Sequence, residues 1–224
     1  MNFKYNLYAQ ALYKGSLLNE KEKVEVAEKL SYFTGLKKEY ILKSNLRILR
    51  HRFQKELLAE KGLAIGRLDG RFMGKEVDQL SDGPHLGDPS SYQISGAYTA
   101  ALNHYFASDL KIKMDRPYIT SNSEIEQKWN WRTVPKDQYW EPSTVSVSRK
   151  LAETMRRNTE MRVMVANGYY DLICPFFDAE FTFTRNGIER DKIKMSYYEG
   201  GHMMYTHEPD FIKLSNDIRE FYNK

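Results

Sequence analysis

The amino-acid sequence predicts an α/β fold in which a mostly helical first part precedes parallel strands joined by crossover helices. Three observations lead to this prediction. Segments with helical apolar spacing fill the first sixty residues, two short apolar runs at 161–166 and 193–198 have the character of buried strands, and helical segments stand before, between and after these runs. Such an alternation implies parallel strands. We therefore divide the chain into a mostly helical region with an irregular aromatic connection, 1–142, and a strand-and-helix region, 143–224.

The composition is that of a folded protein with an ordinary surface. Of the 224 residues, 41% are hydrophobic and 13% are aromatic, which is enough to build a core. The 34 basic and 30 acidic residues are mixed along the chain without a block of Lys and Arg, so we expect no nucleic-acid partner. No apolar run approaches the ~20 residues that a membrane span needs, so we expect no span. The first residues lack the apolar stretch of a signal peptide, and the compartment stays open, including a periplasmic one for a parent enzyme.

The first sixty residues are predicted to form a helical subdomain. Asn19 is a good N-cap for a helix over 20–33, and Gly35 would end that helix. A second charged, amphipathic segment runs to Gly62. The side chains expected to face the core are Val24, Ala27, Leu30 and Phe33 in the first helix, and Leu46, Leu49, Phe53 and Leu57 in the second.

The middle of the chain changes character twice. Residues 63–89 are rich in Gly and Asp and include Gly-Arg-Leu-Asp-Gly-Arg-Phe at 66–72. The charged side chains of this stretch could bind an acidic group, although an ion pair that holds the loop is the favoured interpretation. A helix is expected over 92–110. Residues 115–142 then carry all three Trp residues without periodicity, and we predict an irregular connection that packs over another part of the protein or lines a cleft.

The last eighty residues show the clearest helix and strand signals. An amphipathic helix over 146–158 precedes the first strand. Pro175 suits the start of the helix between the strands, and Asn186-Gly187 suits its end. The second strand leads to a terminal helix over 209–222.

Polar side chains follow both predicted strands at the point where each strand ends. Asp171 comes shortly after the first strand, and His202 follows the second on a loop with Gly200 and Gly201. The carboxyl ends of neighbouring parallel strands adjoin, at the edge where ligands bind in open α/β folds. Such a placement lets a carboxylate orient an imidazole and stabilise its charged form. The alternative from spacing alone is a turn carboxylate and a partly buried histidine.

Other candidate groups are weaker. His202, His207 and Glu208 lack the His-x-x-x-His spacing of a helical metal site, and we predict no metal and no cofactor. Cys174 is the only cysteine, which excludes an intrachain disulfide. It precedes Pro175 in an apolar stretch, where a packed thiol is favoured over a nucleophile.

Two motifs around Asp171 and His202 resemble those of a known family. Asn-Gly-Tyr-Tyr-Asp-Leu at 167–172 and Glu-Gly-Gly-His-Met-Met-Tyr at 199–205 strongly resemble the two C-terminal signatures of the serine carboxypeptidase family, which belongs to the α/β-hydrolase superfamily. The 66–72 stretch is similar to one found in a bacterial branch of that family. The resemblance covers nearly the whole chain.

The resemblance implies a fold, an activity and two residue roles. Residues 1–142 would form the family's helical cap, and 143–224 would form the C-terminal strands and helices of an α/β-hydrolase core. The implied activity is the release of C-terminal residues from peptides through an acyl-enzyme. In that reaction His202 acts as general base and then acid, and Asp171 orients it.

The chain departs from the family in one respect that decides its activity. No Gly-x-Ser-x-Gly stands anywhere in the sequence, so the motif of the nucleophile is absent. The resemblance also places the oxyanion hole and the binding residues for the substrate's terminal carboxylate upstream. We expect the C-terminal portion of a serine-type carboxypeptidase, inactive alone, with a peptide substrate and a missing N-terminal half, in cis or as a second chain. The alternatives are a non-catalytic binding or assembly module and one half of a split hydrolase.

Overall fold

The computed structural model describes residues 2–140 and 144–223, and their contacts divide the chain into two units. Helices dominate, and the described strands form two small sheets, so the chain mixes helix and strand in agreement with the predicted class. The predicted boundary between residues 142 and 143 lies outside the described residues. Unit 1 comprises Met1–Tyr92, Tyr170–Ile173 and Gly201–Met203, and unit 2 comprises Gln93–Tyr169, Cys174–Gly200 and Met204–Lys224.

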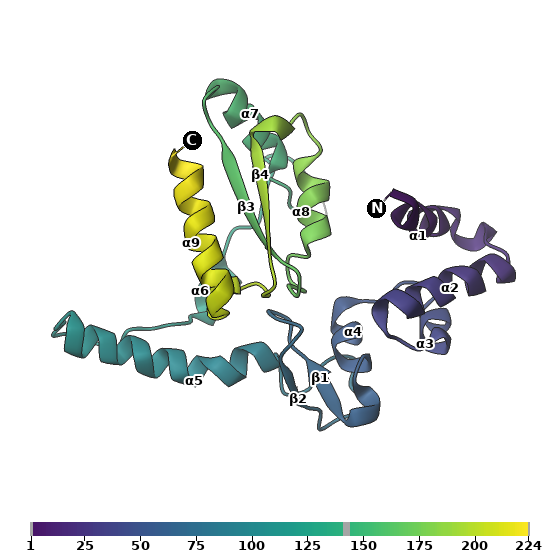
Figure 1. Ribbon diagram of the computed structural model, residues 1–224, viewed down its shortest axis with the longest axis horizontal. Coiled ribbons are helices and arrows are strands. Elements are labelled where there is room, and N and C mark those ends of the chain that lie inside the picture. Colours follow the sequence, from purple (N-terminus) through teal and green to yellow (C-terminus); the bar gives the residue numbers. More distant parts are fainter. Residues whose placement is uncertain (1, 141–143, 224) are drawn as a thin grey trace. The chain divides into compact units, whose positions relative to one another are not determined.

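Figure 1 labels the helices and strands of both units. None of the described helices is long and apolar enough to cross a membrane. In chain order the elements are α1 (Asn2–Lys14), α2 (Glu20–Thr34), α3 (Lys38–Lys43), α4 (Arg50–Glu56), β1 (Leu63–Ile65), β2 (Met73–Lys75), α5 (Pro89–His104), α6 (Ser123–Lys128), α7 (Ser148–Arg157), β3 (Val163–Gly168), α8 (Phe176–Phe183), β4 (Ile193–Tyr198) and α9 (Glu208–Asn223).

The helix α2 in unit 1 has the caps that its sequence predicts. The Asn19 side chain accepts a hydrogen bond from the Glu22 amide at 2.9 Å, and the Glu22 carboxylate accepts one from the Asn19 amide at 3.0 Å. This reciprocal pair satisfies two amides that the first turn of a helix leaves without backbone partners. Gly35 ends the helix with a φ of 75°, a left-handed conformation that glycine adopts without strain.

A hydrophobic core packs these helices together, but two predicted core positions are wrong. Phe33 is 53% exposed and Leu49 is 49% exposed. Phe33 lies in the last turn of α2, where its ring contacts that of Tyr32, with 5.1 Å between the centroids. The second predicted helix is interrupted at Leu46, whose φ is 62°, and α4 begins only at Arg50, so Leu49 stands before the helix. The buried residues of this core are Ala11, Leu18, Val26, Ala27, Leu36, Ile41 and Leu46.

The Gly- and Asp-rich stretch contains a β-hairpin that we did not predict. The strands β1 and β2 pair antiparallel over three residues each. Strands of this length are too short to show an alternating pattern in the sequence. Residues 66–72, called here the 66–72 loop, connect them, and the Gly66 amide donates to the Phe72 carbonyl at 2.8 Å. The hairpin therefore holds the 66–72 loop at both of its ends.

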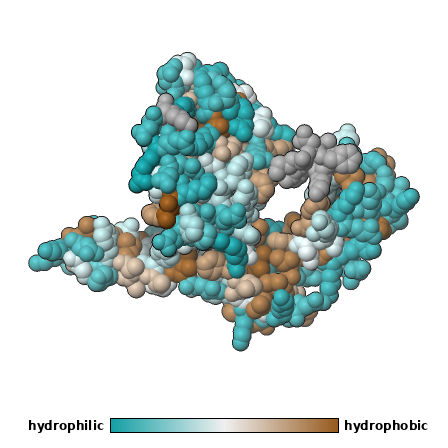
Figure 2. Space-filling view, viewed as in Figure 1, coloured by the Kyte–Doolittle hydropathy of each residue, from teal (hydrophilic) through white to brown (hydrophobic). Residues whose placement is uncertain are grey.

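The aromatic connection is irregular, as predicted, apart from the short helix α6. Its Trp side chains are exposed, Trp129 by 60%, Trp131 by 62% and Trp140 by 78%. Trp129 and Trp131 contact each other, with 6.3 Å between ring centroids. The expectation that the Trp residues pack over another part of the protein is therefore wrong for the described chain. Figure 2 shows hydrophobic residues interspersed with hydrophilic ones over α5. Tyr98 of this helix is 51% exposed.

Unit 2 contains the parallel pair of strands that the sequence predicts. β3 and β4 pair in parallel, from Val163 opposite Ile193 to Gly168 opposite Tyr198. β4 has its predicted bounds, whereas β3 begins and ends two residues later than expected. In Figure 1, α9 lies on one side of this pair and α8 on the other. Because the register is parallel, the two strands end at the same edge.

The helices α7 and α9 attach to this pair of strands in different ways. Ala152 and Met155 of α7 are fully buried in a cluster with Ile193 of β4. α9 attaches by a polar contact, since the Tyr198 hydroxyl donates to the Asp217 carboxylate at 2.8 Å. Burial, together with this bond, raises the pKa of Tyr198. Tyr198 therefore keeps its proton and its bond to α9 at neutral pH.

Candidate functional site

Asp171 lies on a tight loop just beyond β3. This loop, Tyr170–Ile173, belongs to unit 1 together with Gly201–Met203, the segment that follows β4. The Asp171 side chain is only 6% exposed, and its Oδ1 atom accepts a hydrogen bond from the Ile173 amide at 2.7 Å. A carboxylate bonded to the amide two residues ahead closes an Asx turn. The loop therefore orients its own carboxylate.

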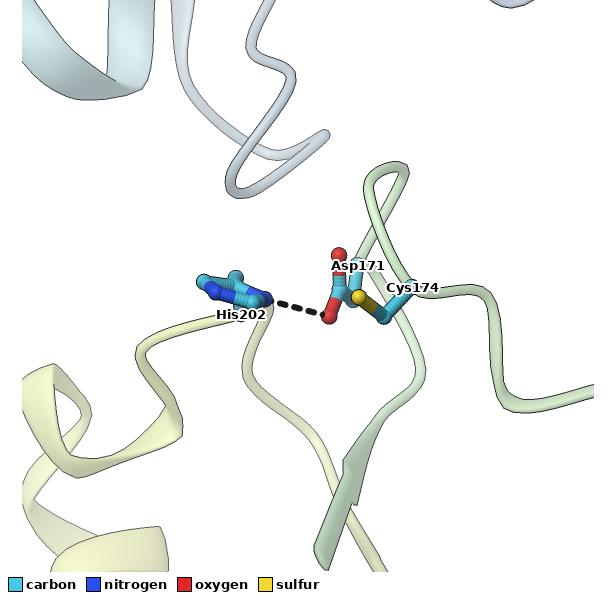
Figure 3. A group of neighbouring side chains, drawn as sticks. All are labelled: Asp171, Cys174 and His202. Carbon is cyan, nitrogen blue, oxygen red and sulfur yellow. Dashed lines mark hydrogen bonds and ion pairs between the residues drawn. The ribbon is translucent and has the colours of Figure 1, made fainter. Parts of the chain in front are cut away.

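The structure brings His202 to the other oxygen of this carboxylate. His202 Nδ1 lies 2.9 Å from Asp171 Oδ2, and Figure 3 shows the bond between the two loops. Since an ionised carboxylate only accepts hydrogen bonds, Nδ1 carries the proton of the neutral ring and Nε2 keeps a lone pair. The His202 side chain is 42% exposed. An imidazole held in this tautomer can take a proton at Nε2, and the buried carboxylate stabilises the charge that results.

The 66–72 loop holds the backbone on the His202 side of the pair. The His202 amide donates to the Leu68 carbonyl at 2.6 Å, and the Gly201 amide donates to Asp69 Oδ2 at 3.0 Å. A Cβ atom added to Gly201 would lie 2.3 Å from the Leu68 carbonyl oxygen, which is closer than real Cβ atoms approach. The backbone at position 201 thus contacts the loop directly, and only glycine fits there.

The same loop holds the backbone on the Asp171 side. The Gly70 amide donates to the Tyr170 carbonyl at 2.9 Å, and the Leu172 amide donates to the Arg67 carbonyl at 3.2 Å. These two bonds flank Asp171 in the sequence. The 66–72 loop therefore binds the chain segments of both members of the pair, a role that the sequence alone did not indicate.

Asp69 and Arg71 form the loop-holding ion pair that the sequence favours. Arg71 Nη2 lies 2.7 Å from Asp69 Oδ2, and the Arg71 amide and Nε atom both donate to Asp69 Oδ1. The Asp69 side chain is 6% exposed, and the Arg71 side chain is 34% exposed. The guanidinium also lies over the Tyr170 ring, with 5.2 Å between Cζ and the ring centroid. The ion pair therefore joins two residues of the 66–72 loop and stabilises its conformation.

A second carboxylate supports the 66–72 loop from the start of α5. Asp88 accepts hydrogen bonds from the Arg67 amide at 2.7 Å, from the Leu68 amide at 3.3 Å and from the Ser90 hydroxyl. Burial raises the pKa of Asp88, but the bonds from the Ser90 hydroxyl and the Arg67 amide lower it more. The net result is a pKa below the ordinary value of 3.8. The loop is therefore anchored by an anion at neutral pH.

Unit 2 contains a second Asp–His pair that reasoning from the sequence missed. His207 Nδ1 lies 3.0 Å from Asp210 Oδ2, and the side chains are 37% and 6% exposed. Asp210 Oδ1 also accepts a hydrogen bond from the Glu199 amide at 3.2 Å. The available signal was the spacing of three residues at the start of a helix, which places two side chains side by side.

Cys174, which Figure 3 also labels, has an exposed side chain. The prediction of a packed thiol is therefore wrong, because the residue lies in a bend before α8 and not within an element. Asp171 and His202 carry a carboxylate and an imidazole, groups that can hold a metal ion such as zinc. Because Asp171 Oδ2 and His202 Nδ1 already bond to each other, a metal at these atoms would have to replace that bond.

Comparison with known proteins identifies no relative of this chain. No protein-family model matches it, and neither a curated protein nor a solved structure is significantly similar to it. The resemblance of the two motifs to the serine carboxypeptidases therefore stays an interpretation of the sequence. The feature of the structure that bears on function is the geometry of the Asp171–His202 pair.

Proposed function

We propose that the chain is the C-terminal, acid–base portion of a serine carboxypeptidase-like hydrolase of the α/β-hydrolase fold. The observation that carries this proposal is the 2.9 Å hydrogen bond between the buried Asp171 carboxylate and the Nδ1 atom of the half-exposed His202. The two residues follow paired parallel strands, at the end where α/β folds bind their ligands. Their order along the chain, Asp before His, is that of α/β-hydrolase triads.

In the proposed reaction His202 moves a proton in each of two stages. A serine hydroxyl from the rest of the enzyme attacks the scissile carbonyl carbon of a peptide, and its proton passes to Nε2. The C–N bond then breaks, and Nε2 gives this proton to the leaving amine. Water next attacks the acyl-enzyme and loses a proton to Nε2, which returns it to the departing serine oxygen. Asp171 keeps the ring in the required tautomer and stabilises its charged form throughout.

The proposal requires a further part of the protein, in cis or as a second chain. That part supplies the nucleophile and the oxyanion hole, because no Gly-x-Ser-x-Gly stands in this sequence. The aromatic connection supports a role for such a partner, since Tyr139 is 89% exposed and Trp140 is 78% exposed. Large aromatic side chains of this kind are typical of interfaces. The substrate class is a peptide with a free C-terminus.

A non-catalytic binding or assembly module is the second candidate function. The observation that favours it is the same exposed aromatic surface, because a module of this kind needs such a surface and no nucleophile. The two candidates differ in what they require of His202. A hydrolase needs its Nε2 atom, whereas a binding module keeps its properties without it.

The test compares two proteins. One is the chain alone, and the other is the chain joined to an upstream part that contains a Gly-x-Ser-x-Gly motif. A serine-directed fluorophosphonate and a blocked dipeptide serve as probes. We expect neither labelling nor hydrolysis from the chain alone, and both from the complemented protein. His202→Gln should abolish labelling, because the hydroxyl is then not activated. His51→Gln is the matched control, since His51 is an exposed histidine paired with Asp82 elsewhere in unit 1.

Two results would contradict the proposal in different ways. Stoichiometric labelling of a serine in the isolated chain would reveal a nucleophile within these 224 residues. A complemented protein that folds, binds a partner and stays inert would support the binding module instead.

A further inference from the structure

We propose that Asp69 is a positioning residue that sets the place and tautomer of His202. Its Oδ2 atom accepts the Gly201 amide at 3.0 Å, one residue before His202 in the chain. The effect of Asp69 on turnover rests on the proposed function, but its effect on the His202 ring does not. Nothing in the reaction itself calls on Asp69, which acts only through the backbone that it holds.

Both oxygens of Asp69 are committed to this task. Oδ1 accepts from the Arg71 amide at 2.9 Å and from Arg71 Nε at 3.0 Å, while Oδ2 accepts from Arg71 Nη2 at 2.7 Å and from Gly201. A buried carboxylate is costly unless its charge is paired and its lone pairs are satisfied. Arg71 supplies the opposite charge in a bidentate arrangement. Oδ2 accepts one further hydrogen bond, and the donor is the Gly201 amide in the segment that carries His202.

The 66–72 loop packs directly against the backbone of Gly201 and His202, with no room for a side chain at position 201. A Cβ atom on Gly201 would lie 2.6 Å from the Asp69 Cα atom and 2.3 Å from the Leu68 carbonyl oxygen. The His202 amide bonds to the same Leu68 carbonyl at 2.6 Å. A change in the position of the loop therefore moves the His202 backbone with it.

The loop also bonds to the segment of Asp171, so a single element fixes both ends of the catalytic hydrogen bond. Hydrogen bonds join the 66–72 loop to the two segments, and four of them are described here. Three of them run between backbone atoms, from Gly70 to Tyr170, from Leu172 to Arg67 and from His202 to Leu68. The fourth uses the Asp69 side chain. Because this bond alone among the four uses a side chain, a substitution of Asp69 can directly weaken the attachment of the loop to the His202 segment.

The experiment reads the tautomer of His202 in the 224-residue chain labelled with ¹⁵N-histidine. Long-range ¹H–¹⁵N correlation spectra distinguish Nδ1–H from Nε2–H, and His202→Gln identifies the His202 signals. In the wild-type chain we expect the Nδ1–H form, held by Asp171. Asp69→Ala should lower the ratio of Nδ1–H to Nε2–H by roughly tenfold, about the worth of one hydrogen bond to a charged group. Asp171→Asn marks the complete loss of that preference.

Matched variants separate positioning from a general loss of structure. Asp82→Ala removes another unit 1 carboxylate that is bonded to an arginine, and it should leave the ratio unchanged. Arg71→Gln keeps the Asp69 carboxylate but removes its counter-charge, and it should shift the ratio in the same direction by a smaller factor. Arg71→Gln decides the question if Asp69→Ala does not fold. A wild-type ratio in folded Asp69→Ala would overturn the proposal, as would an equal shift in Asp82→Ala.

The outcome for Asp69 is independent of the outcome for the proposed function. A shifted tautomer in a complemented protein that hydrolyses no peptide would retain the positioning role and reject the hydrolase. Full hydrolysis by complemented Asp69→Ala, with an unchanged pH profile, would retain the hydrolase and reject the positioning role. If both hold, Asp69→Ala should lower kcat and leave KM nearly unchanged, because Asp69 contacts no substrate.

Discussion

Two Asp–His pairs of nearly equal geometry lie in different units of this chain, but they are held in different ways. The distance from Nδ1 to the carboxylate is 2.9 Å for His202 and Asp171 in unit 1, and 3.0 Å for His207 and Asp210 in unit 2. The carboxylate side chain is 6% exposed in each pair, and the imidazole is 42% exposed in the first and 37% in the second. Distance and burial alone do not distinguish them.

The two pairs differ in the sequence separation between their histidine and their aspartate. His207 and Asp210 are three residues apart at the start of α9, where the helix itself sets the contact. Asp171 and His202 are 31 residues apart and stand on separate loops, which the 66–72 loop then ties together. A spacing of three residues brings the local pair together, and the only support from outside α9 that we describe is the bond from the Glu199 amide to Asp210. The distant pair depends on contacts between remote parts of the sequence, which is why the proposed function is assigned to it and not to the local pair.

The largest expected effect separates the two pairs by turnover. In the complemented protein, His202→Ala should reduce kcat by several powers of ten, since loss of a triad histidine costs on the order of 10⁶ in turnover. Asp171→Asn favours the wrong tautomer and should cost on the order of 10⁴, as in a serine protease triad. His207→Ala should do far less, because a histidine on a helix start has no place in the proton transfer.

The measurement is kcat and KM for a blocked dipeptide, after melting curves show that the three variants are equally folded. We expect KM to change far less than kcat, because neither histidine has to bind substrate in this scheme. If His207→Ala lowered kcat by several powers of ten and His202→Ala stayed active, the general base would have to be reassigned to the second pair.

Elements with a strong local signal are predictable from this sequence. β4 has its predicted bounds, and α2 has its predicted caps. β3 is the instructive error, because Asn167 and Gly168 have the composition of a turn, yet they continue the strand opposite Tyr197 and Tyr198. Pairing with a neighbouring strand outweighs the local preference of those two residues.

The site is predictable only where topology dictates it. Asp171 and His202 come together because parallel strands end at one edge, a rule that holds for any sequence with this order of elements. The bond between Gly201 and Asp69 joins residues that are 132 positions apart, and no local pattern encodes it. The exposure of Trp140 could not be predicted from the sequence either, because it depends on which surfaces the connection packs against.

A smaller effect concerns the two adjacent glycines that serve the two pairs. Gly201→Ala would drive a Cβ atom to 2.3 Å from the Leu68 carbonyl oxygen, beside the first pair. Gly200→Ala would place one 2.7 Å from the Met204 Cα atom and 3.2 Å from Asp210 Oδ2, beside the second. Overpacking of this kind typically costs about 1–3 kcal/mol. We expect Gly201→Ala to lower the free energy of unfolding more than Gly200→Ala.

Denaturant unfolding of the variants measures this difference, with Gly96→Ala as the control. Gly96 lies within α5 and a Cβ there would meet nothing within 4 Å, so alanine should raise the free energy of unfolding by about 0.5–1 kcal/mol. A Gly201→Ala protein as stable as the wild type would show that the 66–72 loop yields easily, and the contrast between the two pairs would lose its basis.

The smallest effect is expected at acid pH, in the loop that holds the first pair. Asp88 anchors the 66–72 loop, and its pKa in the folded chain lies below the ordinary value of 3.8. A carboxyl group with a lowered pKa contributes stability that is present above its unfolded value and is lost as the pH falls through the folded value. Below about pH 3.8 the Arg67 and Leu68 amides should therefore lose protection from hydrogen exchange. The Leu151 amide, which bonds to the Val147 carbonyl in unit 2, is the reference. In Asp88→Asn, which keeps an acceptor oxygen but cannot ionise, this acid-dependent loss should disappear. Equal loss at Leu151 and Arg67 in the wild-type chain would mean that acid loosens both units together, and the loop would then have no pH response of its own.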